Sequence, residues 1–399
     1  MKQHIISLGF LLFISFGFFT ITAKAYATFT ISDVDTSELR KQPDISCLII
    51  DFKYDEDSLK ILEMGNIALS SVAKYDSLYG KGAIWNQLWN YLAQHSLPVW
   101  YVGGLVTADK NDMAFDTFFK KGWKYLRDIR SLSQDPTFHS HAKSKTFMPE
   151  ATNIENYTGI IVGDFSKKVK KYNRLFPGFI LLNDAVFEYA NNKHKLASLF
   201  TGDLKKFKPI CKSYPKAYSD QLIDQIDNDF PCDTIVIKPI NSTRGQGIIM
   251  LQKKDLDKTL RKIFLEKKDL KNNKDTPYTY WTKDHNDIFL VESLEQSKHI
   301  TIDNKKHDPT ARIICILEYN NQEQIKLTFL GGYWKFPKKS IEQEGTLTEK
   351  HKSYVLRRKN IYAKPINEKD STYMQNLFLQ VLPELYKKML IRNKSLETV

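Results

Sequence analysis

The sequence predicts a mixed α/β and α+β protein of two or three packed units. In its first half, short apolar segments alternate with segments of helical spacing, which is typical of an α/β unit with a mainly parallel sheet. Later, at Thr234–Leu251, two apolar segments are separated only by a short polar loop, which predicts a hairpin. A chain of 399 residues is also longer than one small core accommodates.

Composition and charge favour a protein that binds small anions. The chain is 42% hydrophobic and 26% charged, which excludes a disordered or fibrous class, and its formal net charge is +13. The lysines are scattered, as in Lys253–Lys268, rather than gathered with arginine and aromatic residues along one track. No helix-turn-helix, zinc-finger or RNA-binding signature accompanies them, so we predict no nucleic-acid partner.

Residues 1–27 are predicted to be a signal peptide. Ile5–Ile21 is a largely apolar run without charges, and Ala23–Ala27 offers two small-x-small sites for a signal peptidase. Cleavage there predicts an exported protein that is periplasmic, secreted or delivered into a host cell. The alternative is an uncleaved membrane anchor, because the apolar run is near the lower length for crossing a bilayer.

Residues 28–183 are predicted to form the α/β unit. Ser46–Phe52 has the pattern of a strand, and Ser58–Leu78 has the leucine spacing of a helix. The further elements expected here are a helix at Ile84–His95 and strands at Val99–Gly104, Thr158–Asp164 and Phe179–Leu182. Ser131–Ile154 lacks periodicity and is predicted to be an irregular loop. Helices follow in Leu181–Phe200, near the boundary of the unit.

The cysteines give no sign of a structural zinc site, because they show neither CxxC spacing nor histidines at zinc-finger intervals. Cys211 and Cys232 flank one helix-like segment and form a disulfide in one interpretation. In the other, these two stay free like Cys47 and Cys315, which have the surroundings of buried strand residues.

The hairpin at Thr234–Leu251 contains the most informative segment. Thr234–Ile237 is a β-branched strand, Asn241–Gly247 (NSTRGQG) is a small polar loop, and Ile248–Leu251 resumes as a strand. A Walker loop is excluded because GxxxxGK[ST] is absent, and a Rossmann fingerprint is excluded because the loop leads into a strand.

The residue types in this loop fit phosphate binding. Gly245 and Gly247 allow backbone N–H groups to approach phosphate oxygens, Ser242 and Thr243 add hydroxyl donors, and Lys238 supplies a cation. Chemistry on a nucleoside triphosphate needs such groups because charge must be neutralised in a site that excludes water.

This segment resembles the second nucleotide-binding strand and glycine loop of the ATP-grasp superfamily. Upstream, Asn191–Phe200 is similar to the family's helix that begins with an Asp-Lys pair, whose lysine touches the nucleotide phosphates. The resemblance assigns that role to Lys193, with Lys195 as the rival.

Two downstream segments follow in the order of the same family. Ile288–Leu294 resembles the strand and hinge at the adenine, where Glu292 would accept hydrogen bonds from the ribose. Asp308–Leu317 is similar to the strand whose arginine faces the transferred phosphate, which would be Arg312.

The resemblance implies a fold of an N-terminal α/β pre-ATP-grasp domain followed by a two-lobed ATP-grasp domain with antiparallel sheets. The implied ranges are 28–183 for the first domain, 184–290 for the first lobe with the glycine loop, and 291–399 for the second lobe and a C-terminal helix. The implied catalytic residues are Arg312 and Lys238. The implied nucleotide-binding residues are Lys193, Lys238, Ser242, Thr243, Gly245, Gly247, Ile248 and Glu292.

The metal site departs from the family pattern. ATP-grasp enzymes take magnesium ligands from an acidic residue and then a Glu-x-Asn pair on late strands. The only Glu-x-Asn in this chain is Glu318-Tyr319-Asn320, directly after the Arg312 strand and earlier than expected. Either Glu318 and Asn320 bind magnesium in a divergent arrangement, or the metal site is degraded.

The resemblance implies an ATP-dependent carboxylate-amine ligase that acts through an acyl phosphate, with ATP and magnesium as cofactors. Its partner would be an unknown carboxylate or amine substrate, such as an amino acid or peptide. Export conflicts with this activity because ATP is scarce outside the cytoplasm. Two alternatives therefore remain: an exported nucleotide-binding or interaction protein with a degraded catalytic site, and an ATP-grasp-derived kinase.

Overall fold

The computed structural model describes residues 27–394, apart from 32–38, 40–41, 67–68, 104–114, 127, 133, 145–152, 164–177, 191, 244, 267–275, 321–323 and 354–362. Except for Ala27, the predicted signal peptide or anchor lies outside the described residues. Among the helices that are described, none is both long and apolar enough to cross a membrane. The fold is a mixed α/β fold with antiparallel sheets, as predicted.

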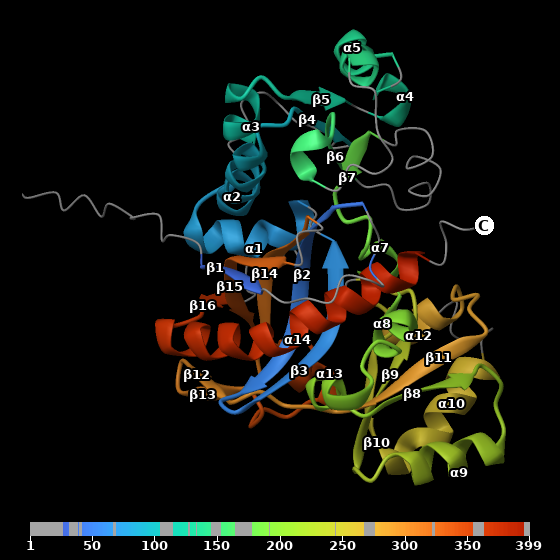
Figure 1. Ribbon diagram of the computed structural model, residues 1–399. Coiled ribbons are helices and arrows are strands. Elements are labelled where there is room, and N and C mark those ends of the chain that lie inside the picture. Colours follow the sequence, from blue (N-terminus) through green and yellow to red (C-terminus); the bar gives the residue numbers. More distant parts are fainter. Residues whose placement is uncertain are drawn as a thin grey trace, which may run out of the picture.

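The central sheet has six strands in the order β1-β15-β14-β2-β3, with β16 also paired to β15. All of these pairs are antiparallel. Segments from both ends of the chain lie side by side in it, because β2 pairs with β14 (Figure 1). Its strands are β1 (Thr28–Ile31), β2 (Asp44–Asp55), β3 (Ser58–Asn66), β14 (Thr310–Tyr319), β15 (Ile325–Lys335) and β16 (Ala363–Pro365).

The prediction of one helix over Ser58–Leu78 is wrong in its first half. Residues Ser58–Asn66 form β3, and helix α1 (Leu69–Tyr79) begins only afterwards. Leu59 and Ile61 are two residues apart and both enter the core, which is the period of a strand. The central sheet therefore takes in β1, β2 and β3, which were predicted to belong to the N-terminal α/β unit.

A separate parallel sheet of order β5-β4-β6-β7 confirms the predicted α/β unit in the residues after α1. Ser131–Ile154 is not wholly irregular, because helices α4 and α5 and a 3₁₀ helix include parts of it. This unit contains β4 (Val99–Val102), β5 (Lys124–Leu126), β6 (Gly159–Gly163), β7 (Phe179–Leu181), α2 (Ala83–Leu92), η1 (Ala93–His95), α3 (Asp116–Lys120), α4 (Ile129–Leu132), α5 (Pro136–Ser144) and η3 (Ile154–Asn156).

The small sheet has the antiparallel order β10-β9-β11-β8. It confirms the predicted hairpin at Thr234–Leu251, in which Ile237 pairs with Ile249. Its strands are β8 (Cys211–Pro215), β9 (Thr234–Pro239), β10 (Ile249–Gln252) and β11 (Ile288–Ser293). The accompanying helices are α7 (Phe187–Ala190), α8 (Lys193–Ala197), η4 (Gly202–Phe207), α9 (Asp220–Asp229), η5 (Lys253–Asp255), α10 (Leu256–Phe264) and α12 (Thr276–Trp281).

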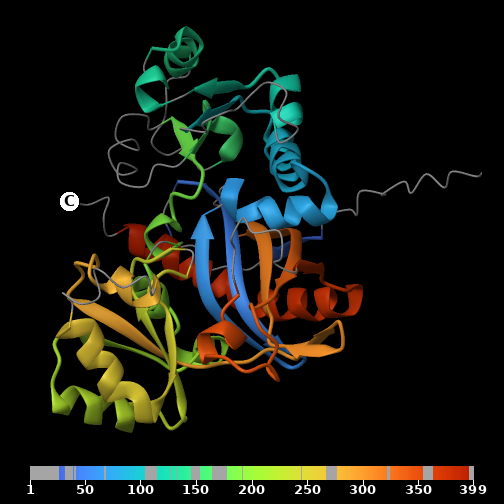
Figure 2. The ribbon, with the colours of Figure 1, turned by 180° about the vertical axis from the view of Figure 1, so that it is seen from behind.

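The central sheet has a core on each face. On one face, α14 (Glu368–Lys394) packs against Phe52 and Phe329. In Figure 2, which views the molecule from behind, α14 crosses behind the strands of this sheet. On the other face, Ile49 and Ile314 pack with α2. The remaining described elements are β12 (Ile300–Ile302), β13 (Lys305–His307) and α13 (Leu347–His351).

All four cysteines are free. Cys47 and Cys315 are buried on opposite faces of neighbouring strands, and Cys211 and Cys232 are half-buried. The structure therefore shows the second of the two interpretations left open by the sequence.

Replacing Phe378 by Ala is expected to lower the free energy of unfolding by about 3–5 kcal/mol, because a large buried side chain leaves a cavity. Phe378 is fully buried, and its ring meets that of Phe52 edge-on with centroids 4.8 Å apart. The control is Tyr373→Ala on the same helix, whose side chain is 51% exposed and whose loss should stay below about 1 kcal/mol. Urea unfolding measures both, and equal losses would contradict the packing of α14 described above.

Candidate functional site

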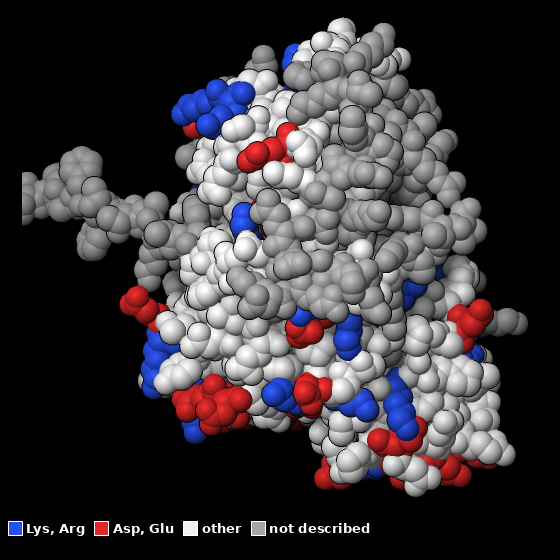
Figure 3. Space-filling model, in the orientation of Figure 1, with Lys and Arg blue, Asp and Glu red and all other residues white. Residues whose placement is uncertain are grey.

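Charged side chains gather where the central sheet meets the small sheet. Most of them are buried, whereas Figure 3 shows exposed charges of both signs mixed over the lower part of the surface. We call this set the junction cluster. Its members are Asp51, Glu63, Lys193, Lys208, Lys238, Glu292, Arg312, Lys335 and Lys352.

The central sheet contributes a row of charges across three strands. In its register, Arg312 of β14 lies opposite Asp51 of β2, which lies opposite Glu63 of β3. Arg312 donates to both carboxylate oxygens of Asp51, at 2.6 and 2.8 Å, and Lys335 Nζ donates to Oδ2 at 2.5 Å. Burial opposes ionisation of Asp51, but Arg312 and Lys335 outweigh it and hold its pKa well below the usual range. Burial and the neighbouring Arg312 lower the pKa of Lys335 to about 8, against the attraction of Asp51.

The backbone of Glu63 pairs with Asp51 in the sheet, but its carboxylate forms no hydrogen bond or ion pair with the described residues. Its charge acts on cations of both sheets, namely Lys193, Lys208, Arg312, Lys335 and Lys352. Like charges directly opposite each other on a sheet are destabilising, so the pair of Asp51 and Glu63 needs compensation. Carboxylate oxygens are the ligands that magnesium prefers, and the donor set therefore fits this ion.

Lys193 lies against the glycine loop. It is the first residue of α8, whose N-cap is Asn192, and its Nζ donates to the carbonyl oxygen and the hydroxyl of Ser242. Burial lowers the pKa of Lys193, with Glu63 acting in the opposite direction. The rival candidate, Lys195, instead pairs with Glu188 at 2.7 Å on the surface. The structure therefore brings only Lys193 of the two to the loop.

Lys238 and Lys208 share one buried carboxylate. Glu292 is 1% exposed and accepts from Lys238 at Oε2 and from Lys208 at Oε1, the latter at 2.7 Å. Burial raises the pKa of Glu292, but the two lysines outweigh this effect and lower it to about 2. Lys208 also donates to the carbonyl oxygens of Ile61 and Leu62 on β3, at 3.1 and 3.2 Å. Glu292, expected at the ribose, is here an internal counter-ion that joins the two sheets.

The glycine loop has the backbone conformation that its sequence predicts. Gly245 and Gly247 have φ angles of +68° and +71°, a region that disfavours side chains. Trp281 Nε1 donates to the Gly247 carbonyl at 2.9 Å, and a Cβ on Gly247 would also collide with Pro239. Ser242 is buried beneath the loop, Thr243 is exposed, and Ile248 is half-buried. The end of the loop is thus fixed on the small sheet.

The structure does not bring Glu318 and Asn320 to the junction cluster. Glu318 lies six residues after Arg312 on β14, which corresponds to about 20 Å along a strand. It pairs with His95 at 3.0 Å and Lys326 at 3.1 Å, and Tyr91 donates to it at 2.6 Å. No group of three or more His, Cys, Asp and Glu side chains suited to a metal occurs among the described residues. A magnesium ion at Asp51 and Glu63 would therefore keep water or phosphate oxygens as its other ligands.

The sequence analysis missed five members of the cluster: Asp51, Glu63, Lys208, Lys335 and Lys352. One available signal was the alternation of apolar and polar residues at Leu59, Lys60 and Ile61, which is typical of a strand. That pattern would have placed Glu63 on a strand, but its partner strands are not readable from local sequence.

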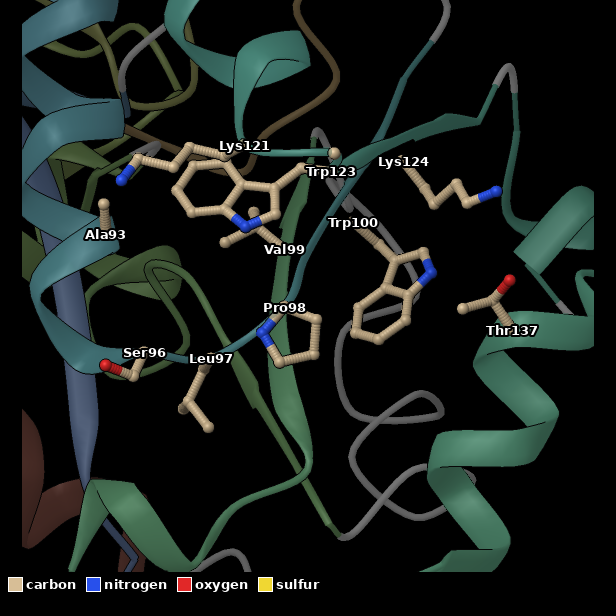
Figure 4. Close-up of a pocket in the computed structure, with 11 residues that line it drawn as sticks. Ala93, Ser96, Leu97, Pro98, Val99, Trp100, Lys121, Trp123, Lys124 and Thr137 are labelled. Carbon is tan, nitrogen blue, oxygen red and sulfur yellow. The ribbon is translucent and has the colours of Figure 1, made fainter.

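Two cavities lie outside the cluster. One of about 440 Å³ opens beside Trp100 and Trp123 and is flanked by Lys121 and Lys124 (Figure 4). It lies at the amino ends of β4 and β5, whereas ligands of open α/β sheets bind outside the carboxyl ends of the strands. The other, of about 360 Å³, follows the edge strand β8. Neither is lined by a residue of the junction cluster.

Comparison with known proteins gives no family assignment. No protein-family model matches the sequence, and no curated protein matches it. Among solved structures, a putative gamma-glutamylcysteine synthetase from Methylobacillus flagellatus is similar, with a TM-score of 0.44, 9% identity, and coverage of 90% of this chain and 92% of that one. D-alanyl-alanine synthetase A from Vibrio cholerae has a TM-score of 0.30 and 10% identity, over 58% of this chain and 59% of its own. Likeness at this level assigns neither fold nor function, so the site is argued from its geometry alone.

Glu292→Gln is expected to lower the free energy of unfolding at pH 7 by about 3–5 kcal/mol, because two buried lysines lose their counter-charge. The folded pKa of about 2 lies below the ordinary 4.5. The charge of Glu292 therefore contributes about 3 kcal/mol that is fully present above pH 4.5 and is lost as the pH falls towards 2. The deficit of the variant should shrink accordingly between pH 7 and pH 3 in urea unfolding.

The control for this variant is Glu384→Gln. Glu384 is 52% exposed and pairs with Lys387 three residues away, so its loss should cost less than about 1 kcal/mol. A deficit in Glu292→Gln that is unchanged at pH 3 would contradict the proposed coupling.

Proposed function

We propose that the protein is an ATP-dependent carboxylate-amine ligase of the ATP-grasp kind that acts through an acyl phosphate. The observation that carries this proposal is the junction cluster: cations from two sheets converge beside a glycine loop, opposite two neighbouring carboxylates. A triphosphate needs cations and backbone donors on several sides in a site that excludes water, and this arrangement supplies them.

The small sheet would hold the nucleotide phosphates. Lys193 donates to Ser242 of the glycine loop, and Lys238 precedes this loop on β9. The positive φ angles at Gly245 and Gly247 let backbone groups come close to a ligand. Glu292 forms ion pairs with Lys238 and Lys208 and thereby holds both side chains in place. These lysines require little rearrangement to bind a phosphate.

The central sheet would act on the phosphate that is transferred. Arg312 presents a planar guanidinium suited to bidentate contact with phosphate oxygens, and Lys335 adds a second cation. Asp51 and Glu63 would hold magnesium, which supplies charge neutralisation and orientation of the phosphates when bound. Release of Arg312 or Lys335 from Asp51 would then free these cations for the phosphate.

The proposed reaction has two steps. A carboxylate oxygen of one substrate attacks the γ-phosphorus of ATP, and ADP leaves with the electrons of the broken bond. The amine of a second substrate then attacks the acyl carbon, loses a proton, and displaces inorganic phosphate. The lysines of the junction cluster favour an anionic first substrate such as an amino acid or a peptide.

The pairing of Asp51 with Glu63 favours a working enzyme over one with a degraded metal site. The degraded alternative depended on the position of Glu318 and Asn320, and these residues are not needed if Asp51 and Glu63 hold the ion. Export remains part of the proposal, and ATP would then come from a host cell. Alternatively, a membrane anchor would keep the rest of the chain in the cytoplasm, which supplies ATP.

Incubation of the protein with ATP, magnesium and pairs of candidate carboxylates and amines is expected to release ADP and phosphate. Lys193→Met removes the cation and keeps an apolar stem, so it should lower the rate about 100-fold or more. Lys195→Met is the matched control two residues away and should leave the rate unchanged. Release of AMP and pyrophosphate instead of ADP would overturn the acyl phosphate mechanism.

Glu63→Gln is expected to weaken ATP binding in the presence of magnesium by about tenfold or more, because it removes one of two carboxylate ligands. Without ligands the variant should be somewhat less stable than the wild type, because the charge of Glu63 favours the charged forms of the neighbouring Lys193, Lys335 and Lys352. Calorimetric titration at several magnesium concentrations measures the effect. The control is Glu56→Gln in the exposed turn between β2 and β3, and an unchanged magnesium dependence in Glu63→Gln would exclude the proposed metal ligand.

A further inference from the structure

Residues 337–353, which follow β15, reach from the central sheet to the small sheet. Pro337 and Ser353 pair as an isolated bridge, so the two ends of the segment between them are held together. Helix α13 lies within this segment and begins with a capping box formed by Thr346 and Glu349. Figure 1 shows α13 between β3 and the strands of the small sheet. The segment is therefore a defined structure that spans the junction.

A buried carboxylate fastens this segment to the central sheet. Asp308 has no exposed surface, and its Oδ2 lies 2.7 Å from Lys53 Nζ and 2.7 Å from His351 Nδ1. Its other oxygen accepts from the backbone N–H of Ser297 at 2.8 Å. His351 is the last residue of α13, so this contact fixes the C-terminal end of the helix.

The same segment touches the glycine hairpin of the small sheet. The backbone N–H of Met250 donates to Thr348 Oγ1 at 3.3 Å. The side chain of Lys352 lies directly over Gly245, where an added Cβ would be 2.7 Å from Lys352 Cε and 3.4 Å from Nζ. Lys352 thus follows the anchored His351 and lies against the loop at Gly245, whereas Lys193 contacts the loop at Ser242.

The charge environment of Lys352 is that of the junction cluster. Its ammonium group interacts with Glu63, the same carboxylate that acts on Lys193 and Arg312. It is half-buried. Lys352 thus lies between the glycine loop and the carboxylate of Glu63. A phosphate group bound at the loop would lie on the other side of its ammonium group.

We propose that Lys352 is a further phosphate-binding residue, and that the contact of His351 with Asp308 positions it over the glycine loop. This inference rests on the proposed function, because it assigns another contact to the same nucleotide. Lys193 on α8 and Lys238 on β9 lie on the side of the small sheet, whereas Lys352 lies in the segment that follows β15 of the central sheet. Phosphate binding would therefore draw the two sheets together through α13.

The direct test is calorimetric titration of the full chain with ATP and magnesium and, separately, with inorganic tripolyphosphate. Lys352→Ala is expected to weaken both by about tenfold or more, the usual effect of losing one charge-assisted contact. Lys350→Ala is the matched control, since this lysine lies on α13 two residues earlier. Equal binding by the two variants overturns the role of Lys352, whereas a wild-type chain that binds neither ligand overturns the proposed function itself.

The positioning role has its own readout. His351→Ala should weaken tripolyphosphate binding and also speed hydrogen exchange at the Met250 amide, because α13 loses its anchor on Asp308. His351→Asn keeps a donor near the position of Nδ1 and should restore both properties. Weakened binding with unchanged exchange at Met250, or no recovery in His351→Asn, would overturn the role of His351.

Discussion

The buried carboxylate of Glu292 holds the junction between the two sheets together. A lysine removed from water is costly unless a counter-charge accompanies it, and two lysines, Lys208 and Lys238, share this one. Lys208 extends the contact to the backbone of β3, so one acidic side chain links the small sheet to the central sheet. The relative placement of the glycine loop and the Arg312 row follows from this link.

A second constraint lies in the central sheet, where Asp51 and Glu63 are closer to each other than the stability of the fold alone would favour. Asp51 is neutralised by Arg312 and Lys335, while Glu63 beside it has no partner among the described side chains. Proteins commonly retain such unfavourable groups where a ligand completes the arrangement. The junction cluster as a whole holds six cations against three carboxylates, and this excess of positive charge suits an anionic ligand.

The sequence predicted those parts of the site that depend on local chemistry. The hairpin was readable because β-branched strands flank a loop whose glycines need positive φ angles, whereas Lys193 was assigned only through the resemblance to the ATP-grasp helix. The pairing of β2 with β14 was not readable, because Asp51 and Arg312 are 261 residues apart and no local pattern encodes such a contact. Glu63 became part of a site only through that pairing.

The error at Ser58–Asn66 has the same origin. The apolar residues of this segment fit both a helical spacing and an alternating one, and pairing with β2 selects the strand. Glu292 shows the converse case, since its strand was predicted while its role as a counter-ion depended on Lys208, for which no local pattern predicts a position near Glu292.

The central sheet pairs strands from both ends of the chain, and this pairing has a consequence for biosynthesis. The hairpin of β2 and β3 leaves the ribosome early, but the strand that covers β2 is made only after about three quarters of the chain has been translated. Until then β2 is an apolar edge with unpaired backbone groups, a state that invites association with other nascent chains. Contacts of such long sequence separation also form slowly. The chain should therefore depend on chaperones during synthesis more than its compact native form would indicate.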